Sequence, residues 1–332
     1  MGSQVKFDAL FSGFSRLKVG VIGDVMLDTY WWGHVDRISP EAPVPVVLLD
    51  RKEYRIGGAG NVALNLASLG AQATMLSVTG ADADAQTLRG LLTDKAIDTR
   101  YLLQAADRIT TNKSRIISRN QQMMRLDAET TLDLSAADEA RLLEAITTYI
   151  SQEQPAIIIF EDYNKGVLTD TVIRETIRIC KEHNVLTAVD PKRKSFFSYK
   201  GVDLFKPNLK EIREALNLLP GAVTEETMRS MHEALHQRLQ HRISLITLSE
   251  KGIFYQEDGQ SGVLPTHQRN IADVSGAGDT VIAVASLVYA ATKDLKLAAG
   301  MANIAGGLVC EEVGTAAIDA RKLRQEATLL LG

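Results

Sequence analysis

Short apolar runs alternate with amphipathic segments along most of this 332-residue chain. The runs are apolar throughout, which is typical of strands buried on both faces, and the segments between them have the apolar spacing of helices. Strands that alternate with helices form a parallel sheet covered by helices on both sides. We therefore predict an α/β fold of three layers, α/β/α, around a mainly parallel sheet. The predicted strands are 18–23, 73–78, 155–160, 185–190, 202–205 and 243–248, and the predicted helices are 57–69, 84–95, 169–183, 208–216, 280–290 and 295–310.

Two regions break this alternation. Residues 30–50 hold Pro40, Pro43 and Pro45 between β-rich runs, and residues 108–127 alternate without helix signals. We interpret both as strands of a small β lid over the carboxyl edge of the sheet, inserted in a single domain over 1–332. A flap of this size cannot bury both its faces alone, so we expect a homodimer through the lids. The alternative is a lid that folds down on its own domain.

Charge and composition exclude several partners. The net charge of −4, with basic residues scattered along the chain, argues against nucleic-acid binding. The longest uncharged apolar-rich run, 297–310, is too short to span a membrane. Cys180 and Cys310 lie far apart within apolar helical patterns, which predicts buried free thiols and a reducing, cytoplasmic location.

The segment 273–280 reads Asp-Val-Ser-Gly-Ala-Gly-Asp-Thr and leads directly into an apolar helix. A Gly-x-Gly turn at a helix start leaves the backbone N–H groups of Gly276, Ala277 and Gly278 free to hold an anion. Asp279 beside that cradle suits a base that takes a proton from an attacking hydroxyl. The alternative is that Asp279 only caps the helix.

Polar residues also follow several predicted strands. Any one of them can be explained as a cap or turn residue. Because the carboxyl ends of parallel strands share one sheet edge, the whole set favours a ligand site there. These residues are Asp24, Asp28, Asp162, Lys165, Asp190, Lys192, Asn208, Glu211, Ser249 and Gly252.

Two of these positions combine into short motifs. Asn208 and Glu211, three residues apart on one helical face, offer hard oxygen ligands for Mg²⁺ held through waters and phosphates. The alternative for this pair is a capping box. The glycine run before Asn61 permits close backbone approach to a ligand, with tight helix–sheet packing as the alternative.

Other nucleotide-binding and catalytic motifs are absent from the sequence. It has no Gly-Lys pair for a P-loop, no third glycine for a dinucleotide fingerprint and no protein-kinase motifs. The histidines show no metal-ligand spacing.

Together these motifs resemble the ribokinase (phosphofructokinase-B) family of sugar kinases along nearly the whole chain. The segment 57–61 is similar to the family's amino-terminal glycine signature, 273–280 to its carboxyl-terminal signature, and Asn208 with Glu211 to its Asn-x-x-Glu motif. Within the family, some members are D-glycero-β-D-manno-heptose 7-phosphate kinases, the kinase half of ADP-heptose synthesis proteins. The segments that resemble them are 33–46, 124–127, 161–166 and 190–192.

The resemblance implies an ATP- and Mg²⁺-dependent, ribokinase-like kinase. It would phosphorylate the anomeric 1-hydroxyl of heptose 7-phosphate to the 1,7-bisphosphate, on the route to ADP-heptose and lipopolysaccharide core. Asp279 is the expected base, Gly276, Ala277 and Gly278 the phosphoryl cradle, and Asn208 with Glu211 the Mg²⁺ site. Asp24, Asp28, Gly58 and Asn61 are expected around the sugar hydroxyls, and Arg125, Lys165 and Lys192 around the sugar or its distal phosphate. Asn208, Thr247, Ser249, Gly252 and Asn303 match positions around the nucleotide, and Asp273 with Ser275 match a monovalent-cation (K⁺) loop of some relatives.

Two other functions stay open at this stage. The chain could be a kinase of the same fold for another sugar or sugar phosphate, or a non-catalytic sugar or nucleotide sensor. Bifunctional relatives carry a second, nucleotidyltransferase domain with a His-x-Gly-His motif, which we do not find in this sequence. We therefore expect a separate nucleotidyltransferase to act downstream.

Overall fold

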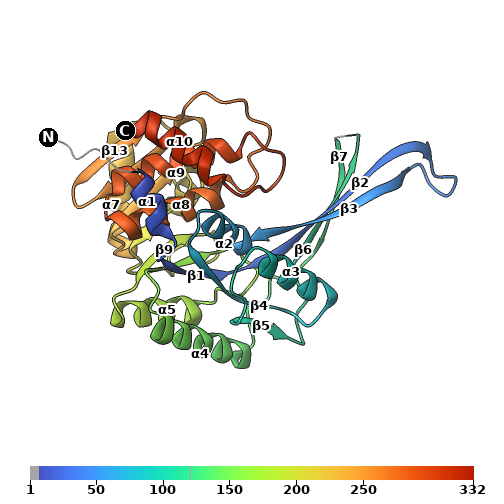
Figure 1. Ribbon diagram of the computed structural model, residues 1–332, viewed down its shortest axis with the longest axis horizontal. Helices are drawn as coiled ribbons and strands as arrows, with labels where there is room; N and C mark the ends of the chain where they lie inside the picture. Colours follow the sequence, from blue (N-terminus) through green and yellow to red (C-terminus); the bar gives the residue numbers. More distant parts are fainter. Residues whose placement is uncertain (1–6, 120) are drawn as a thin grey trace.

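The main body of the protein is built on one nine-stranded sheet (Figure 1). The computed structural model describes residues 7–119 and 121–332, so residues 1–6 and 120 of the predicted domain lie outside the described part. Across the sheet the strands are β13 (Gln260–Leu264), β12 (Ile253–Glu257), β11 (Ile243–Thr247), β10 (Leu204–Phe205), β9 (Leu186–Asp190), β8 (Ile157–Glu161), β1 (Lys18–Gly23), β4 (Gln72–Gly80) and β5 (Leu102–Ala105). Neighbouring strands from β11 to β5 run parallel, while β12 and β13 are antiparallel. The predicted mainly parallel sheet is confirmed.

Helices cover both faces of this sheet, which gives the three predicted layers. Successive side chains of β8 point to opposite faces, with Ile157 and Ile159 in one apolar core and Ile158 and Phe160 in the other. The first core is covered by α1 (Phe7–Phe14), α2 (Ala59–Ser68), α3 (Ala83–Asp94), α8 (Ala277–Thr292), α9 (Leu295–Val309) and α10 (Ala320–Leu331). The second is covered by α4 (Ala136–Glu153), α5 (Asp170–Glu182), α6 (Leu209–Leu216) and α7 (Glu225–Leu239).

Several elements were not predicted from the sequence. Helices α1, α4, α7 and α10 and strands β5, β12 and β13 are absent from the predicted set, and α10, not the helix before it, closes the chain. The missed edge strands carry polar residues such as Gln256 and Gln260, because they do not sit in the buried centre of the sheet. Only strands buried on both faces give the continuous apolar signal on which the prediction rested.

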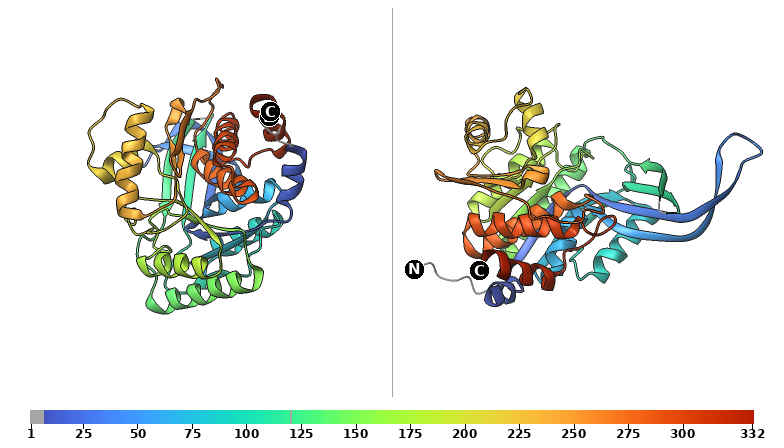
Figure 2. Two further views of the ribbon diagram at one scale, coloured as in Figure 1. Left: turned by 90° about the vertical axis from the view of Figure 1, so that its left-hand side faces the viewer. Right: turned by 90° about the horizontal axis from the view of Figure 1, so that it is seen from above.

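The second sheet is the lid, and it projects away from the main body (Figures 1 and 2). Its four strands lie in the order β3 (Pro45–Gly58), β2 (Val25–Ile38), β6 (Asn112–Ser118) and β7 (Gln121–Ala128). The hairpin strands are longer than the predicted segment 30–50, and residues 108–111 precede β6 instead of belonging to a strand. The lid has no separate linker, since β2 starts just after β1 and β3 runs directly into α2.

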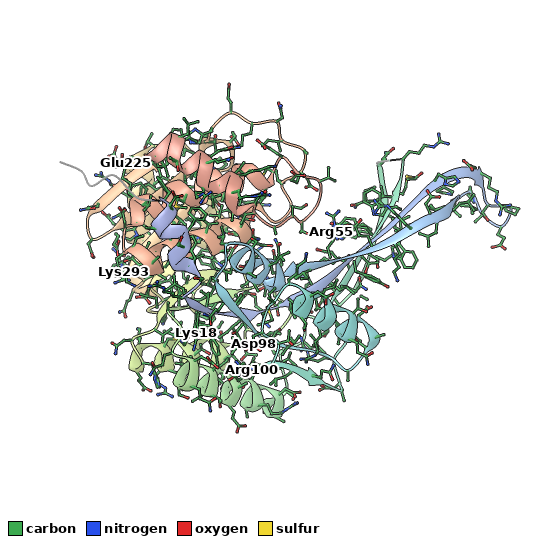
Figure 3. The ribbon with its side chains drawn as sticks, in the orientation of Figure 1. Lys18, Arg55, Asp98, Arg100, Glu225 and Lys293 are labelled. Carbon is green, nitrogen blue, oxygen red and sulfur yellow. The ribbon has the colours of Figure 1, made fainter. Side chains whose placement is uncertain are left out.

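One side chain ties the root of the lid to the main body. Arg55 lies near the end of β3 (Figure 3), and its guanidinium donates a hydrogen bond to the carbonyl of Val313 at 2.9 Å. Val313 belongs to the loop after α9. The lid and this loop are therefore held together at the edge of the sheet.

The cysteines and the apolar helices are the two features that composition singled out. Cys180 and Cys310 are both buried free thiols, as predicted. Within the described part of the chain, none of the helices combines the length and the apolar character needed to cross a bilayer.

Candidate active site

Asp279 lies in the first turn of α8, where that helix meets the carboxyl edge of the sheet, and its side chain is buried. One carboxylate oxygen accepts a hydrogen bond from the Asn61 amide at 2.8 Å, and the other accepts one from the Tyr163 hydroxyl, also at 2.8 Å. Burial raises the pKa of Asp279 above its ordinary value, while these two bonds act in the opposite direction. The N-cap of α8 is Gly276, and the Asp279 side chain bonds to α2 and to the loop after β8, not to its own helix. The capping alternative is therefore wrong.

Glycine shapes the backbone in front of this carboxylate. Gly276 has a φ of 78°, and a Cβ there would lie 2.7 Å from the Asn61 amide nitrogen. Among the described residues, no hydrogen bond uses the N–H groups of Gly276 or Gly278, whereas Ala277 donates to the Val274 carbonyl at 3.3 Å. Of the three predicted cradle groups, the structure thus leaves two free at the positive end of α8.

A cluster of buried charges lies next to the cradle. Single oxygens of Glu161, Asp190 and Asp279 all lie within 4.8 Å of one another. The ammonium of Lys206 is 2.7 Å from Asp190, and that of Lys192 is 3.7 Å from Asp190 and 3.3 Å from Glu211. Sequence reasoning gave no role to Glu161, which looks like the last residue of an apolar strand, or to Lys206.

Lys192 was predicted near the sugar or its distal phosphate, which stays a prediction, and its contacts in the structure are with carboxylates and one tyrosine. Besides Asp190 and Glu211, its ammonium lies over the ring of Tyr163, 5.3 Å from the ring centre. Since Tyr163 bonds to Asp279, these contacts place Lys192 beside the phosphoryl cradle.

Asn208 and Glu211 form the capping box that was the alternative to a metal site. The Asn208 side chain accepts from the Glu211 N–H and the Glu211 side chain accepts from the Asn208 N–H, both at 2.8 Å. The second oxygen of Glu211 faces Lys192. The capping role does not exclude metal binding, which stays a prediction.

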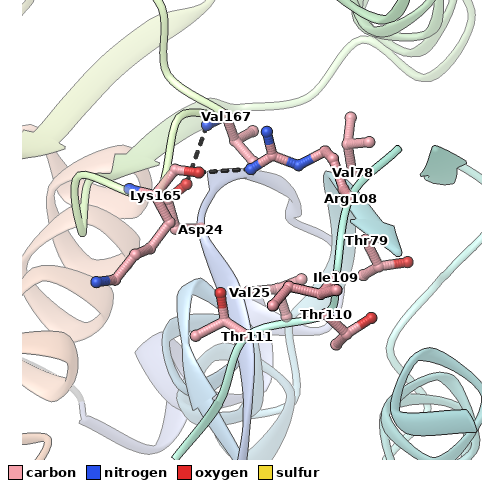
Figure 4. Close-up of a pocket in the computed structure, with 10 residues that line it drawn as sticks. All are labelled: Asp24, Val25, Val78, Thr79, Arg108, Ile109, Thr110, Thr111, Lys165 and Val167. Carbon is pink, nitrogen blue, oxygen red and sulfur yellow. Dashed lines mark hydrogen bonds between the residues drawn. The ribbon is translucent and has the colours of Figure 1, made fainter. Parts of the chain in front are cut away.

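The residues predicted to hold the sugar hydroxyls differ in the contacts that they already make within the protein. Asp28 on β2 is buried and bonds to Arg115 of β6 at 2.6 Å. Asp24 instead accepts three backbone N–H bonds from the loop 163–167, at 2.8, 2.9 and 3.1 Å, part of which is visible in Figure 4. Asp24 therefore holds this loop in shape, and its contact with the sugar stays a prediction. Gly58, with a φ of 57°, permits the turn from β3 into α2 because a Cβ there would lie 2.4 Å from the Asp24 carbonyl oxygen.

The predicted cations near the lid are engaged in ion pairs. Arg125 is half-exposed and bonds to Asp127 at 2.8 and 2.9 Å. Lys165 bonds to Glu129 at 2.6 Å. Lys165 also lines a small pocket at the root of the lid together with Arg108, which sequence reasoning missed (Figure 4).

The residues predicted around the nucleotide lie on β11, on the turn after it and on α9. Thr247 at the end of β11 forms a bridge with Asn208, and Ser249 and Gly252 close a tight turn in which the Gly252 N–H donates to Ser249 at 3.1 Å. The amide of Asn303 on α9 donates to the Pro265 carbonyl at 2.8 Å and so holds the loop after β13.

The predicted cation loop is well ordered by its own hydrogen bonds. The carboxylate of Asp273 accepts from the backbone and hydroxyl of Ser275, at 2.9 and 2.8 Å, and from the N–H of Gly314 at 2.9 Å. The structure brings these two residues together, and their K⁺ role stays a prediction.

The fold and this site define a sugar kinase, and residues 16–322 match the model of the pfkB family carbohydrate kinases. The chain belongs to this family. It is 42% identical to the bifunctional protein HldE of Methylobacillus flagellatus over 95% of this chain and 64% of that protein. It is 38% identical to the HldE of Syntrophotalea carbinolica over 97% of this chain and 65% of that protein. The chain thus spans slightly less than two thirds of these relatives.

A solved structure shows the same fold. Phosphofructokinase-2 from Escherichia coli in complex with potassium superposes with a TM-score of 0.77 at 18% identity, over 95% of this chain and 99% of that one. The fold predicted from the sequence is therefore confirmed, and the match to the family model confirms the predicted family.

Proposed function

We propose that this carbohydrate kinase transfers the terminal phosphoryl group of ATP to the anomeric 1-hydroxyl of D-glycero-β-D-manno-heptose 7-phosphate. The product, the 1,7-bisphosphate, would enter the route to ADP-heptose and lipopolysaccharide core. Similarity to the HldE proteins and the lid segments that resemble heptose 7-phosphate kinases support this substrate. The observation that carries the reaction type is the buried Asp279 carboxylate, oriented by Asn61 and Tyr163 beside free N–H groups.

In this mechanism Asp279 accepts the proton of the sugar hydroxyl as that oxygen attacks. Burial raises the pKa of Asp279, so its carboxylate is a stronger base than an exposed one. The free N–H groups of Gly276 and Gly278 lie at the N-terminus of α8, where they can stabilise negative charge on the transferring phosphoryl group. Such a reaction depends on positioning and charge stabilisation more than on covalent chemistry.

Mg²⁺ would be held by oxygen atoms of Asn208 and Glu211 through water. The donor set fits a hard cation, since both residues offer oxygens and Asn208 is bridged to Thr247, one of the residues predicted around the nucleotide. When bound with ATP, the ion neutralises phosphate charge. Lys192, held at 3.3 Å from Glu211, would add a positive charge at the same place. The Asp273–Ser275 loop is our proposed K⁺ site, which the potassium complex of a structural relative supports.

The distal phosphate of the sugar needs cations on the lid side. Lys165 and Arg125 each hold a carboxylate at hydrogen-bond distance, Glu129 and Asp127 respectively. An arriving dianion would compete with these carboxylates for the same cations. We assign the distal phosphate to Arg125 and Lys165.

An ADP-release assay with a panel of sugars tests this function. We expect turnover of heptose 7-phosphate and little turnover of the same sugar without its phosphate. Equal turnover of both would replace the proposal with a kinase for neutral sugars. Turnover of another sugar phosphate alone would identify a different family substrate, and no turnover of any sugar would leave a sensor.

The lid supports a homodimer in which two lids pack together. It exposes apolar side chains on all its strands but β6. These are Ile38, Leu48, Leu49, Met123, Met124 and Leu126, and Val44 is exposed in the loop between β2 and β3. Covering them would remove apolar surface from water. We further propose that a separate nucleotidyltransferase acts downstream, where an adenylyl group is transferred to the 1-phosphate of the sugar. A cytoplasmic location stays a prediction.

A further inference from the structure

Glu161 is the most unusual charged group in the described part of the chain. Its side chain is completely buried, and neither carboxylate oxygen has a hydrogen-bond partner among the described residues. It ends β8 directly beside Asp190, its register partner at the end of β9, so two like charges are aligned on neighbouring strands. Burying an unpartnered carboxylate is costly, and a second carboxylate beside it raises that cost. Lys206 and Lys192 lie close to Asp190, but among the described residues no ammonium or guanidinium group lies within ion-pair distance of Glu161.

The geometry defines where a positive charge would sit. Oxygens of Glu161, Asp190 and Asp279 lie within 4.8 Å of one another. In an equilateral triangle with that side, the centre is about 2.8 Å from each corner, and shorter sides bring it closer to the 2.0–2.6 Å of cation–carboxylate bonds. A water molecule has only two protons to donate and cannot satisfy three carboxylates.

The formal charges of the groups around this point indicate what charge a bound cation would carry. Besides these three carboxylates, Glu211 joins the cluster through Lys192, and Lys206 bonds to Asp190. Four carboxylates against two ammonium groups leave two negative charges. A divalent cation neutralises them.

We propose that Glu161 and Asp190, directly beside Asp279, hold a divalent cation that binds without nucleotide. This site is separate from the Asn208–Glu211 pair, which we expect to hold Mg²⁺ through waters together with ATP. Glu161 supplies the uncommitted oxygens, whereas Asp190 keeps its bond to Lys206 and Asp279 keeps its bonds to Asn61 and Tyr163. A Cβ on Gly278 would lie 3.5 Å from Asp190, so the ion lies directly behind the phosphoryl cradle. The site does not depend on which sugar is the substrate.

Titration with Mn²⁺ in the absence of nucleotide, followed by electron paramagnetic resonance, tests this site. We expect the wild type to bind one Mn²⁺ per chain. Glu161→Gln keeps the shape but removes a ligand charge, so Mn²⁺ binding should weaken at least about tenfold. Asp162→Asn is the matched control. Asp162 is the next buried carboxylate along the chain, but its side chain accepts a hydrogen bond from Tyr199, which belongs to the core covered by α4 to α7. This variant should bind Mn²⁺ like the wild type.

Thermal melting gives a second readout that also shows whether each variant folds. With a chelator present, Glu161→Gln should melt higher than the wild type, because it lacks one buried charge. Added Mn²⁺ or Ca²⁺ should then raise the melting temperature of the wild type but not that of the variant. If the wild type binds no Mn²⁺ without ATP, or if Glu161→Gln binds it equally well, the site does not exist and Glu161 is a buried neutral acid. Neither result bears on the sugar panel, which tests the proposed function independently.

Discussion

At the scale of single residues, the site depends on which groups orient the Asp279 carboxylate. Its two oxygens receive bonds from Asn61 on α2 and Tyr163 after β8, so three distant segments converge on one group. The sequence motif predicted Asp279 and Asn61 because each follows a glycine turn. It could not predict Tyr163, whose bond to Asp279 depends on the path of the loop after β8, or the Glu161–Asp190 pair, which depends on the register between β8 and β9.

We predict that Asp279→Asn lowers turnover by about 10²–10⁴-fold, the usual contribution of a positioned general base. The asparagine keeps the size of the side chain but cannot accept the proton, so ATP affinity should change little. Steady-state kinetics and ATP titration measure the two quantities. Asp294→Asn, a change in the N-cap of α9, is the matched control and should keep normal turnover. Near-normal turnover in Asp279→Asn would refute the assignment.

Tyr163→Phe should move the acid limb of the turnover profile to higher pH. The Tyr163 hydroxyl bond favours the Asp279 carboxylate, and its loss raises the pKa of Asp279 further. Since the reaction needs the unprotonated carboxylate, the loss of rate should be largest at low pH. Tyr199→Phe, which removes a buried hydroxyl bonded to Asp162, should leave the limb in place. An unchanged limb in Tyr163→Phe would show that this bond does not tune the base.

Substituting Arg125 and Lys192 should show which of the two binds the distal phosphate of the sugar and which acts at the phosphoryl cradle. Arg125→Ala should raise the KM for the sugar phosphate about 10–150-fold, the cost of one charge-assisted bond, with the KM for ATP unchanged. Lys192→Ala should act on turnover or on the KM for ATP, because Lys192 contacts Glu211 and Asp190. A rise in the sugar KM alone for Lys192→Ala would restore its original assignment.

At the scale of elements, the lid is the part whose assembly can be tested directly. Sedimentation velocity at micromolar concentration should show a dimer. Leu126→Glu places a charge among the exposed apolar residues of β7 and should give monomers, whereas Leu132→Glu, an exposed leucine outside the lid, should not. Only monomer in the wild type, with or without ligands, would favour a lid that closes on its own domain.

The helices and strands also show which parts of the fold can be predicted from sequence patterns. The strand predicted at 155–160 lies at Ile157–Glu161, and the helix predicted at 169–183 lies at Asp170–Glu182. These agree because continuous apolar runs and amphipathic spacing belong to buried elements. The lid hairpin was predicted too short, since its outer strands are exposed and its inner ends merge with β1 and α2.

At the scale of the whole molecule, a buried histidine cluster between α7 and β11 should make the folding stability depend on acidic pH. His232 and His241 both bond to the Ser244 hydroxyl, at 2.8 and 2.7 Å. Burial, with neighbouring histidines adding to it, lowers the pKa of His232 to about 4 and that of His241 to about 3.

Folding stability should therefore fall as the pH drops from about 6.5 toward 4. Below an ordinary histidine pKa of about 6.5 the unfolded chain binds protons that the folded chain does not, which favours unfolding. Melting temperatures across this range measure the effect. His241→Gln should make the dependence on pH less steep, while His267→Gln, at an exposed position, should not. The same steepness in His241→Gln and the wild type would contradict this account.

The lid hairpin also has a consequence for how the sequence can vary. The first residues of β2 are buried and its last residues are exposed, and β3 shows the reverse order. As far as packing within one chain decides it, tolerance to substitution should therefore rise from the root, at Asp28 and Gly58, to the tip. A saturation library of 25–58 would display this as a gradient. Any intolerant position near the tip would then mark a surface that another copy of the chain covers.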